Sequence, residues 1–107
     1  MATILILDDR TTNRHIFSRL AHSLDDNIQV EAFGDPALAL DWVREHGADL
    51  VVTDFRMPGM DGAEFTRRLR ALQDDPTAAD IPVIVITAYN DRSYRMEALQ
   101  AGATDFL

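Results

Sequence analysis

Short apolar segments recur along the chain, and the stretches between them are long enough for one helix each. These segments are predicted to be strands, and they cover residues 4–7, 28–33, 50–53, 83–87 and 104–107. The first, third and fourth are almost continuously apolar, which is typical of strands covered on both faces of a sheet. The second alternates between apolar and polar residues, which favours an edge strand. The pattern therefore predicts a five-stranded sheet.

Helix signals fall between the predicted strands. Thr11 or Thr12 is expected to cap a first helix, whose apolar stripe consists of Ile16, Phe17, Leu20 and Leu24. An aspartate–proline pair at residues 35–36 is typical of a helix start, and Gly47 suits the C-terminal turn of that second helix. A fourth helix is expected over residues 92–101, after a third helix whose stripe consists of Phe65, Leu69 and Leu72.

The alternation of strands and helices indicates the fold class. Segments of these lengths in this order predict an α/β fold with a parallel sheet and helices on both of its faces. In the doubly wound, flavodoxin-like order 2-1-3-4-5, the first and third strands are neighbours. No linker, internal repeat or low-complexity segment is evident, so we expect one domain over residues 1–107.

Composition and charge narrow the range of partners. The chain has no cysteine, a formal net charge of −8 and a pI of about 4.6. An acidic domain of this kind is a poor partner for nucleic acid or for an anionic membrane. No apolar run approaches the roughly 18 residues of a transmembrane helix, and no signal peptide precedes the first strand. We therefore expect a cytoplasmic protein that binds neither nucleic acid nor membrane through this domain.

The candidate chemistry lies at the ends of the predicted strands. Asp8 and Asp9 follow the first strand, and Asp54 ends the third within the segment LVVTDFRMPGMDG. Thr87 ends the fourth. Ligands of doubly wound sheets bind beyond the carboxyl ends of the strands, so we expect the three carboxylates to share one pocket. Their mutual repulsion would be relieved by a hard cation with oxygen ligands, for which Mg²⁺ is the natural candidate.

The order and spacing of these motifs resemble the receiver domain of two-component response regulators. Any one acid after a strand is usually a turn residue or a helix cap, but the joint pattern is specific. The resemblance extends over the whole chain, and the segments that carry it are Asp8–Asp9, Asp54, MPGMDG at 57–62, Thr87–Ala88 and GATDFL at 102–107. It implies a signalling switch rather than an enzyme.

The resemblance implies a role for each acidic residue. Asp54 would accept a phosphoryl group from a histidine kinase or a phosphotransfer protein. Mg²⁺ would be bound by Asp9, by Asp54 and by the backbone carbonyl of Arg56. Asp8 would act on the metal through a bound water. Phosphoryl transfer depends mainly on positioning and charge neutralisation, which such a set of groups can supply.

The resemblance also implies a switch and an incomplete C-terminal part. Thr87 would hydrogen-bond the phosphoryl oxygen, and Phe106 would be the aromatic side chain that changes rotamer in response. The family's fifth-strand lysine would fall two positions beyond Leu107, and the fifth helix would follow it. The expectation is thus a receiver domain without its last helix in this chain. An effector domain beyond the chain and a homodimer are both compatible with it.

Three alternatives differ in what they require near the same residues. A phosphatase of the haloacid dehalogenase type needs a second aspartate two positions after the nucleophile, where this chain has Arg56. A flavin-binding module needs a phosphate-binding loop after the first strand, where Asp8 and Asp9 would repel a phosphate. A degenerate receiver that serves only as a protein-interaction module stays open.

Overall fold

The computed structural model describes residues 2–72, 80–87 and 92–107, and these ranges form one sheet with helices packed against it. The strands are β1 Thr3–Leu7, β2 Gln29–Phe33, β3 Leu50–Asp54, β4 Val83–Ile86 and β5 Asp105–Phe106. The helices are α1 Thr11–Leu24, α2 Pro36–His46, α3 Gly62–Arg70 and α4 Arg92–Gln100. None of these helices is long and apolar enough to cross a membrane.

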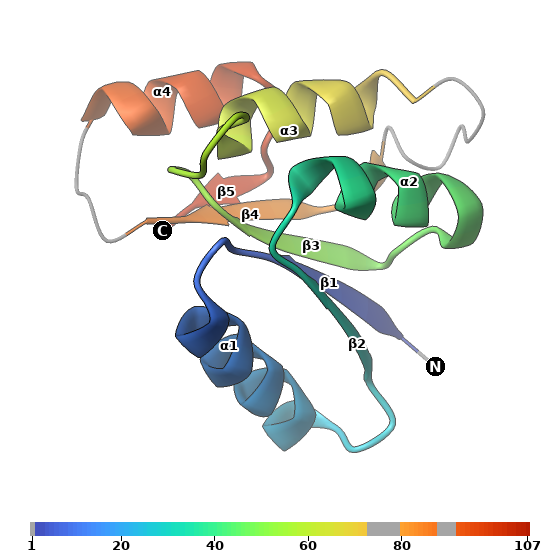
Figure 1. The fold of residues 1–107 in the computed structure, drawn as a ribbon. Helices are drawn as coiled ribbons and strands as arrows, with labels where there is room; N and C mark the ends of the chain where they lie inside the picture. Colours follow the sequence, from blue (N-terminus) through green and yellow to red (C-terminus); the bar gives the residue numbers. More distant parts are fainter. Residues whose placement is uncertain (1, 73–79, 88–91) are drawn as a thin grey trace.

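The five described strands are all parallel and lie in the order β2-β1-β3-β4-β5. This confirms the predicted doubly wound, flavodoxin-like sheet, including the edge position of the second strand. Figure 1 shows α1 on one face of the sheet and α2, α3 and α4 on the other. Because β1 and β3 are neighbours that leave for helices on opposite faces, their carboxyl ends border the switch point at which ligands bind in such sheets.

The core divides along the alternation of side chains in β1. Leu5 and Leu7 point into the larger cluster, which α2, α3 and α4 cover and which includes Phe65. Ile4 and Ile6 point to the opposite face, where they pack with Ala21 of α1. Successive residues of a strand face opposite sides of a sheet, so a continuous apolar strand supplies both clusters.

The start of α1 differs from the prediction. Neither Thr11 nor Thr12 caps the helix, because the N-cap is Arg10 and its side chain makes no capping hydrogen bond. The carboxylate of Asp8 instead accepts a hydrogen bond from the Arg10 N–H, at 2.9 Å. The side chain of Asp8 therefore orders the turn that a capping threonine was expected to order, and the helix begins at Thr11.

The predicted apolar stripe of α1 is wrong in most of its members. Ile16, Leu20 and Leu24 are 50%, 57% and 79% exposed, whereas Phe17 is half-buried and Ala21 is buried against the sheet. Phe17 and Ala21 are one turn apart and occupy the side of the helix that meets the sheet. Among the described residues no second helix lies on this face, so the flank of α1 that carries the three aliphatic residues stays open.

The remaining helices agree with the sequence signals. Asp35 caps α2 by accepting a hydrogen bond from the Ala37 N–H at 2.9 Å, and Gly47 ends that helix with a φ of 75°. Phe65 and Leu69 of α3 are fully buried as predicted, whereas Leu72 lies after the helix and is half-buried. The fourth helix also occupies nearly its predicted range.

Candidate functional site

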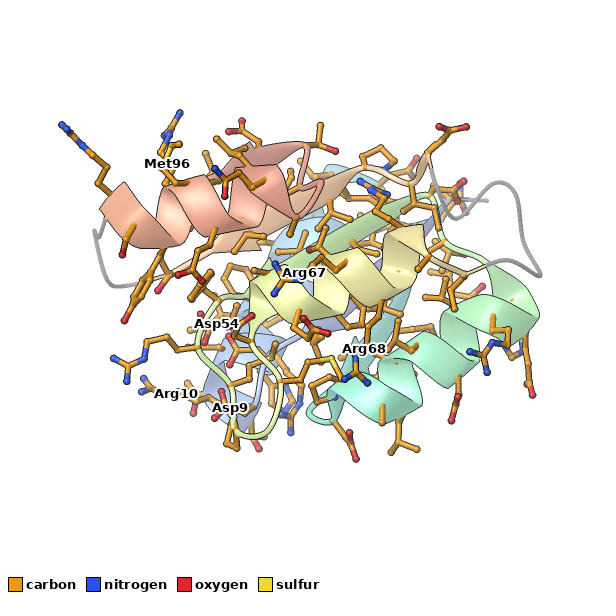
Figure 2. All side chains as sticks on the ribbon, turned by 90° about the horizontal axis from the view of Figure 1, so that it is seen from above. Asp9, Arg10, Asp54, Arg67, Arg68 and Met96 are labelled. Carbon is orange, nitrogen blue, oxygen red and sulfur yellow. The ribbon has the colours of Figure 1, made fainter. Side chains whose placement is uncertain are left out.

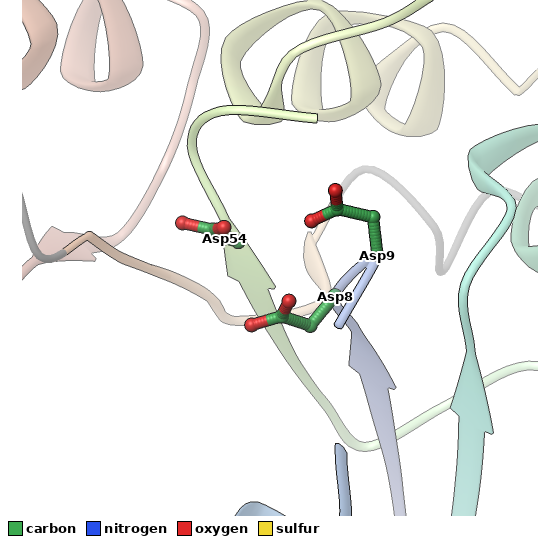
Figure 3. Close-up of side chains that lie close together, drawn as sticks. All are labelled: Asp8, Asp9 and Asp54. Atoms are coloured by element: carbon green, nitrogen blue, oxygen red, sulfur yellow. The ribbon is translucent and has the colours of Figure 1, made fainter. Parts of the chain in front are cut away.

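The acidic residues meet where β1 and β3 end. Asp8 and Asp9 directly follow β1, and Asp54 is the last residue of β3, which pairs with β1. One carboxylate oxygen from each of the three lies within 4.8 Å of the others (Figure 3). Asp8 is buried, Asp54 is half-buried and Asp9 is exposed. The structure thus brings together the three acids, which sequence reasoning placed at the ends of the first and third strands and expected to share one pocket.

Asp8 is held in place on three sides. Its Oδ1 accepts a hydrogen bond from the Arg10 N–H at 2.9 Å, and its Oδ2 accepts one from Asn13 Nδ2 at 3.1 Å. The guanidinium of Arg14 donates to the backbone carbonyl of Asp8 at 2.7 Å. Both carboxylate oxygens therefore have protein donors. Asp8 is oriented by the first turn of α1 without any need for a bound cation.

The pKa of the Asp54 carboxyl departs from its ordinary value. Partial burial raises the pKa of the Asp54 carboxyl above its usual value, and the nearby negative charges of Asp8 and Asp9 raise it further. The Phe55 N–H donates a hydrogen bond to Asp54 Oδ1 at 2.8 Å, which partly opposes that rise. A bound cation would act in the same direction as this hydrogen bond, because it favours the charged form of the carboxyl.

The glycine-rich loop after Asp54 folds back, so that Gly62 at its end lies against the backbone of Asp54 and Phe55. The Gly62 N–H donates to the carbonyl of Phe55 at 2.7 Å, and a Cβ at Gly62 would lie 2.5 Å from the carbonyl oxygen of Asp54. Asp61 accepts a hydrogen bond from the Glu64 N–H at 2.8 Å and so caps α3. The backbone of Asp54 is therefore clamped between its own strand and the start of α3.

A pocket of about 390 Å³ opens beside the acids. Its walls include Asp8, Asp54, Thr87, Arg10, Arg56 and Asn13. Figure 2 shows Arg10 beside Asp9, and Arg10 lines the pocket together with Asp54. Thr87 directly follows β4 and lines the same pocket as Asp54. Ala88, which belongs to the same motif, lies outside the described residues.

Sequence reasoning did not single out two polar residues of the pocket wall, Arg10 and Asn13. Arg10 follows the acidic pair directly and Asn13 lies one turn into α1, so their positions relative to Asp8 were the available signal. Phe106, by contrast, is not among the residues that line this pocket. It is 7% exposed and packs in the larger core cluster.

We expect Asp54→Asn to stabilise the metal-free protein at neutral pH. A carboxyl group whose pKa is raised on folding stabilises the folded state below its unfolded pKa, and this contribution is lost as the pH rises through the folded pKa. The difference in unfolding free energy between the variant and the unmodified protein should therefore shrink as the pH falls towards 3.8, the ordinary value for the group. Urea unfolding in the presence of chelator, between neutral pH and pH 3.8, measures this difference in unfolding free energy. The control is the same substitution at an exposed acid, Asp26→Asn. A variant that is no more stable at pH 7 would contradict the raised pKa.

Comparison with known proteins agrees with the fold. The family model for the response regulator receiver domain matches residues 4–107. The cyclic di-GMP phosphodiesterase response regulator RpfG of Xanthomonas campestris is 44% identical over 104 residues, which are 97% of this chain and 27% of RpfG. The chemotaxis protein CheY-3 of Vibrio cholerae is 38% identical over 97% of this chain and 77% of its own length. The chain belongs to the receiver domain family of response regulators, as its motifs indicated.

One solved structure offers a chemical parallel to the acidic pocket. The receiver domain of the sensor histidine kinase PA1611 from Pseudomonas aeruginosa has a magnesium ion coordinated in its active-site cleft. It is 28% identical to this chain, covers 99% of it with 83% of its own length, and superposes with a TM-score of 0.84. The chain spans about a quarter of the length of RpfG, so it corresponds to one part of that larger protein.

Proposed function

We propose that this receiver domain is a phosphoacceptor switch in which Asp54 takes a phosphoryl group from a histidine kinase or a phosphotransfer protein. The observation that carries the proposal is the meeting of three carboxylate oxygens within 4.8 Å around a half-buried Asp54 at the switch point of the sheet. Keeping a charged carboxylate half-buried beside two other acids costs free energy. Acids in such surroundings are typical of functional sites, which supports a reactive role for Asp54.

The proposed reaction is a displacement at phosphorus. An oxygen of the Asp54 carboxylate attacks the phosphorus of a phosphohistidine, and a new P–O bond forms as the P–N bond breaks. The imidazole nitrogen keeps the bonding electron pair and takes up a proton. The product is an acyl phosphate on Asp54. Positioning dominates the rate of such transfers, and the clamp that Gly62 places on the Asp54 backbone supports a fixed nucleophile.

We propose that Mg²⁺ is held by Asp9, Asp54 and the backbone carbonyl of Arg56. Three carboxylates with oxygens within 4.8 Å of one another are the oxygen-rich, negatively charged donor set that this ion prefers. Asp8 already accepts hydrogen bonds at both oxygens, which supports contact with the ion through water rather than directly. When bound, the ion neutralises charge on the carboxylates and on the transferred phosphoryl group.

Thr87 and Phe106 form the proposed switch. Thr87 borders the pocket, where its hydroxyl can reach a phosphoryl oxygen on Asp54. Its backbone N–H donates to the carbonyl of Leu107 at 3.3 Å, and Phe106 pairs with Val85, two residues before Thr87. A shift of Thr87 towards the new charge would therefore be felt at Phe106 through the β4–β5 pair, which is how a local charge change can bias packing elsewhere.

The proposed output depends on regions and partners outside this chain. RpfG is named as a phosphodiesterase and is much longer than this chain, which supports an effector region attached to a related receiver. CheY-3 is covered over 77% of its length, which supports action through a separate partner. The net charge of −8 argues against nucleic acid as the direct partner of this domain.

The test of the proposed function is intact mass after incubation with acetyl phosphate. With Mg²⁺ the protein should gain the mass of one phosphoryl group, and with excess chelator it should gain none. A phosphorylated histidine kinase can then replace acetyl phosphate as donor. Mg²⁺ binding without any mass gain from either donor would favour the degenerate, interaction-only receiver.

We expect Mg²⁺ to stabilise the protein through Asp9. A ligand that binds only the folded state adds about 2.7 kcal/mol to the unfolding free energy at a hundredfold excess over its dissociation constant. Millimolar Mg²⁺ should therefore raise the melting temperature, and Asp9→Ala should abolish the rise. Asp26→Ala, which removes an exposed acid far along the chain from the pocket, should keep it. An equal rise in the Asp9 variant would contradict the proposed ligand set.

A further inference from the structure

Two aromatic side chains stack between the residue after Asp54 and the first turns of α4. The rings of Phe55 and Tyr94 lie 4.5 Å apart between centroids, with an angle of 17° between their planes. Phe55 is 3% exposed and packs in the larger core cluster, and Tyr94 is half-buried against that cluster. Aromatic pairs of this geometry stabilise the folded state by more than their buried area alone would contribute. The stack therefore fixes α4 to the backbone of Phe55.

The backbone of Phe55 is in turn tied to the carboxylate of Asp54. The Phe55 N–H points to two acceptors, Asp54 Oδ1 at 2.8 Å and the carbonyl oxygen of Ile86 at 3.3 Å. The carbonyl of Phe55 accepts from the Gly62 N–H at 2.7 Å, which anchors the residue on its other side. The N–H is thus shared between a charged acceptor on the reactive side chain and a neutral acceptor on β4.

We propose that the Phe55–Tyr94 stack couples the chemical state of Asp54 to α4, with Tyr94 as a positioning residue that acts through Phe55. This rests on the proposed function, because it needs Asp54 to be modified. Modification moves the negative charge from the carboxyl onto the phosphoryl group, so Oδ1 becomes a weaker acceptor. The Phe55 N–H then shifts towards Ile86, the ring moves with its backbone, and the stack on Tyr94 loosens.

This route is separate from the one through Thr87 and Phe106. It begins at a hydrogen bond that the unmodified carboxylate accepts, whereas the other begins at oxygens that the phosphoryl group adds. It reaches α4 directly, whereas the other reaches β5. Coupling between two sites is reciprocal, so a change in the stack should also alter the affinity of Asp54 for a phosphoryl analogue.

Hydrogen exchange of the α4 amides, Arg92–Gln100, tests the proposal on the whole chain. Exchange is compared in Mg²⁺ alone and in Mg²⁺ with beryllofluoride, a phosphoryl analogue. In the unmodified protein the analogue should speed α4 exchange by about two- to twelvefold, the range that an aromatic stack contributes. In Tyr94→Leu this acceleration should disappear, and in Tyr94→Phe, which keeps the ring, it should return.

The chain offers a matched control in a second stack. Trp42 and His46 of α2 have ring centroids 4.5 Å apart and planes at 18°, nearly the geometry of the first pair. Trp42→Leu should leave the acceleration at α4 intact. A loss in that variant equal to the loss in Tyr94→Leu would overturn the proposal, because any broken stack would then have the same effect.

The same experiment separates failure of this inference from failure of the proposed function. Beryllofluoride binding is measured independently by ¹⁹F NMR. If the analogue does not bind the unmodified protein, both the proposed function and this coupling are overturned. If it binds and α4 exchange is unchanged, or if Tyr94→Leu keeps the full acceleration, the proposed function stands and the coupling is overturned.

Discussion

Gly62→Ala is expected to lower the unfolding free energy by about 3 kcal/mol, the upper end of the usual cost of overpacking. The added Cβ would lie 2.5 Å from the carbonyl oxygen of Asp54 and 3.1 Å from the Cα of Phe55. Both are backbone atoms, so neither can swing aside as the end of a side chain can. The clash can be relieved only if β3 and α3 move apart, and that movement displaces Asp54 itself.

Urea unfolding measures the stability of this variant, and Gly34→Ala is its matched control. The atom nearest to a Cβ at Gly34 is Arg14 Nη1 at 2.8 Å, the end of a flexible side chain. That variant should lose clearly less stability. Equal losses in the two variants, or a Gly62 variant as stable as the unmodified protein, would show that Gly62 does not clamp Asp54.

Thr87→Val is expected to slow phosphorylation of Asp54 by about 10²- to 10³-fold, the usual cost of removing one preorganised donor to a developing charge. Valine keeps the shape and the β-branching of threonine and replaces the hydroxyl with a methyl group. Thr87→Ser, which keeps the hydroxyl, should stay close to the unmodified rate. The rate of mass gain with acetyl phosphate and Mg²⁺ measures both variants. A valine variant that reacts as fast as the serine variant would remove Thr87 from the proposed chemistry.

The sheet was predictable from the sequence because its signals are local. A continuous apolar segment such as residues 50–53 is compatible with a strand buried on both faces, and Asp54 then follows at the carboxyl end. Gly47 and Asp35 marked the ends of α2 by their own conformational preferences. Once strand order is right, the meeting of the acids follows from the topology alone.

The errors in α1 came from contacts that a linear pattern does not contain. Two threonines are good candidate caps, but the helix already begins at Thr11, after Arg10 as the N-cap, and Asp8 holds the turn before it through the Arg10 N–H. An apolar stripe indicates which residues are suited to burial. Which of them are actually buried depends on the elements that pack against the helix. Leu20 stays exposed for this reason, while Ala21 beside it is buried.

The different environments of Asp8 and Asp9 were also not predictable from the sequence. In the sequence Asp8 and Asp9 are adjacent and equivalent, yet Asp8 is buried with donors on both oxygens and Asp9 is exposed. The Phe55–Tyr94 stack was equally invisible, because α3 and β4 separate its members along the chain. Such contacts are properties of the packing and have no motif.

Locating the phosphoryl group is the most direct test that Asp54 is the acceptor. After reaction with acetyl phosphate and Mg²⁺, borohydride reduces an acyl phosphate to an alcohol, which converts the modified aspartate to homoserine. Peptide mapping then identifies the position. The account predicts homoserine at position 54 alone, and no product in Asp54→Asn. Homoserine at position 8 or 9 in the unmodified protein, or undiminished phosphorylation of the Asp54 variant, would contradict it.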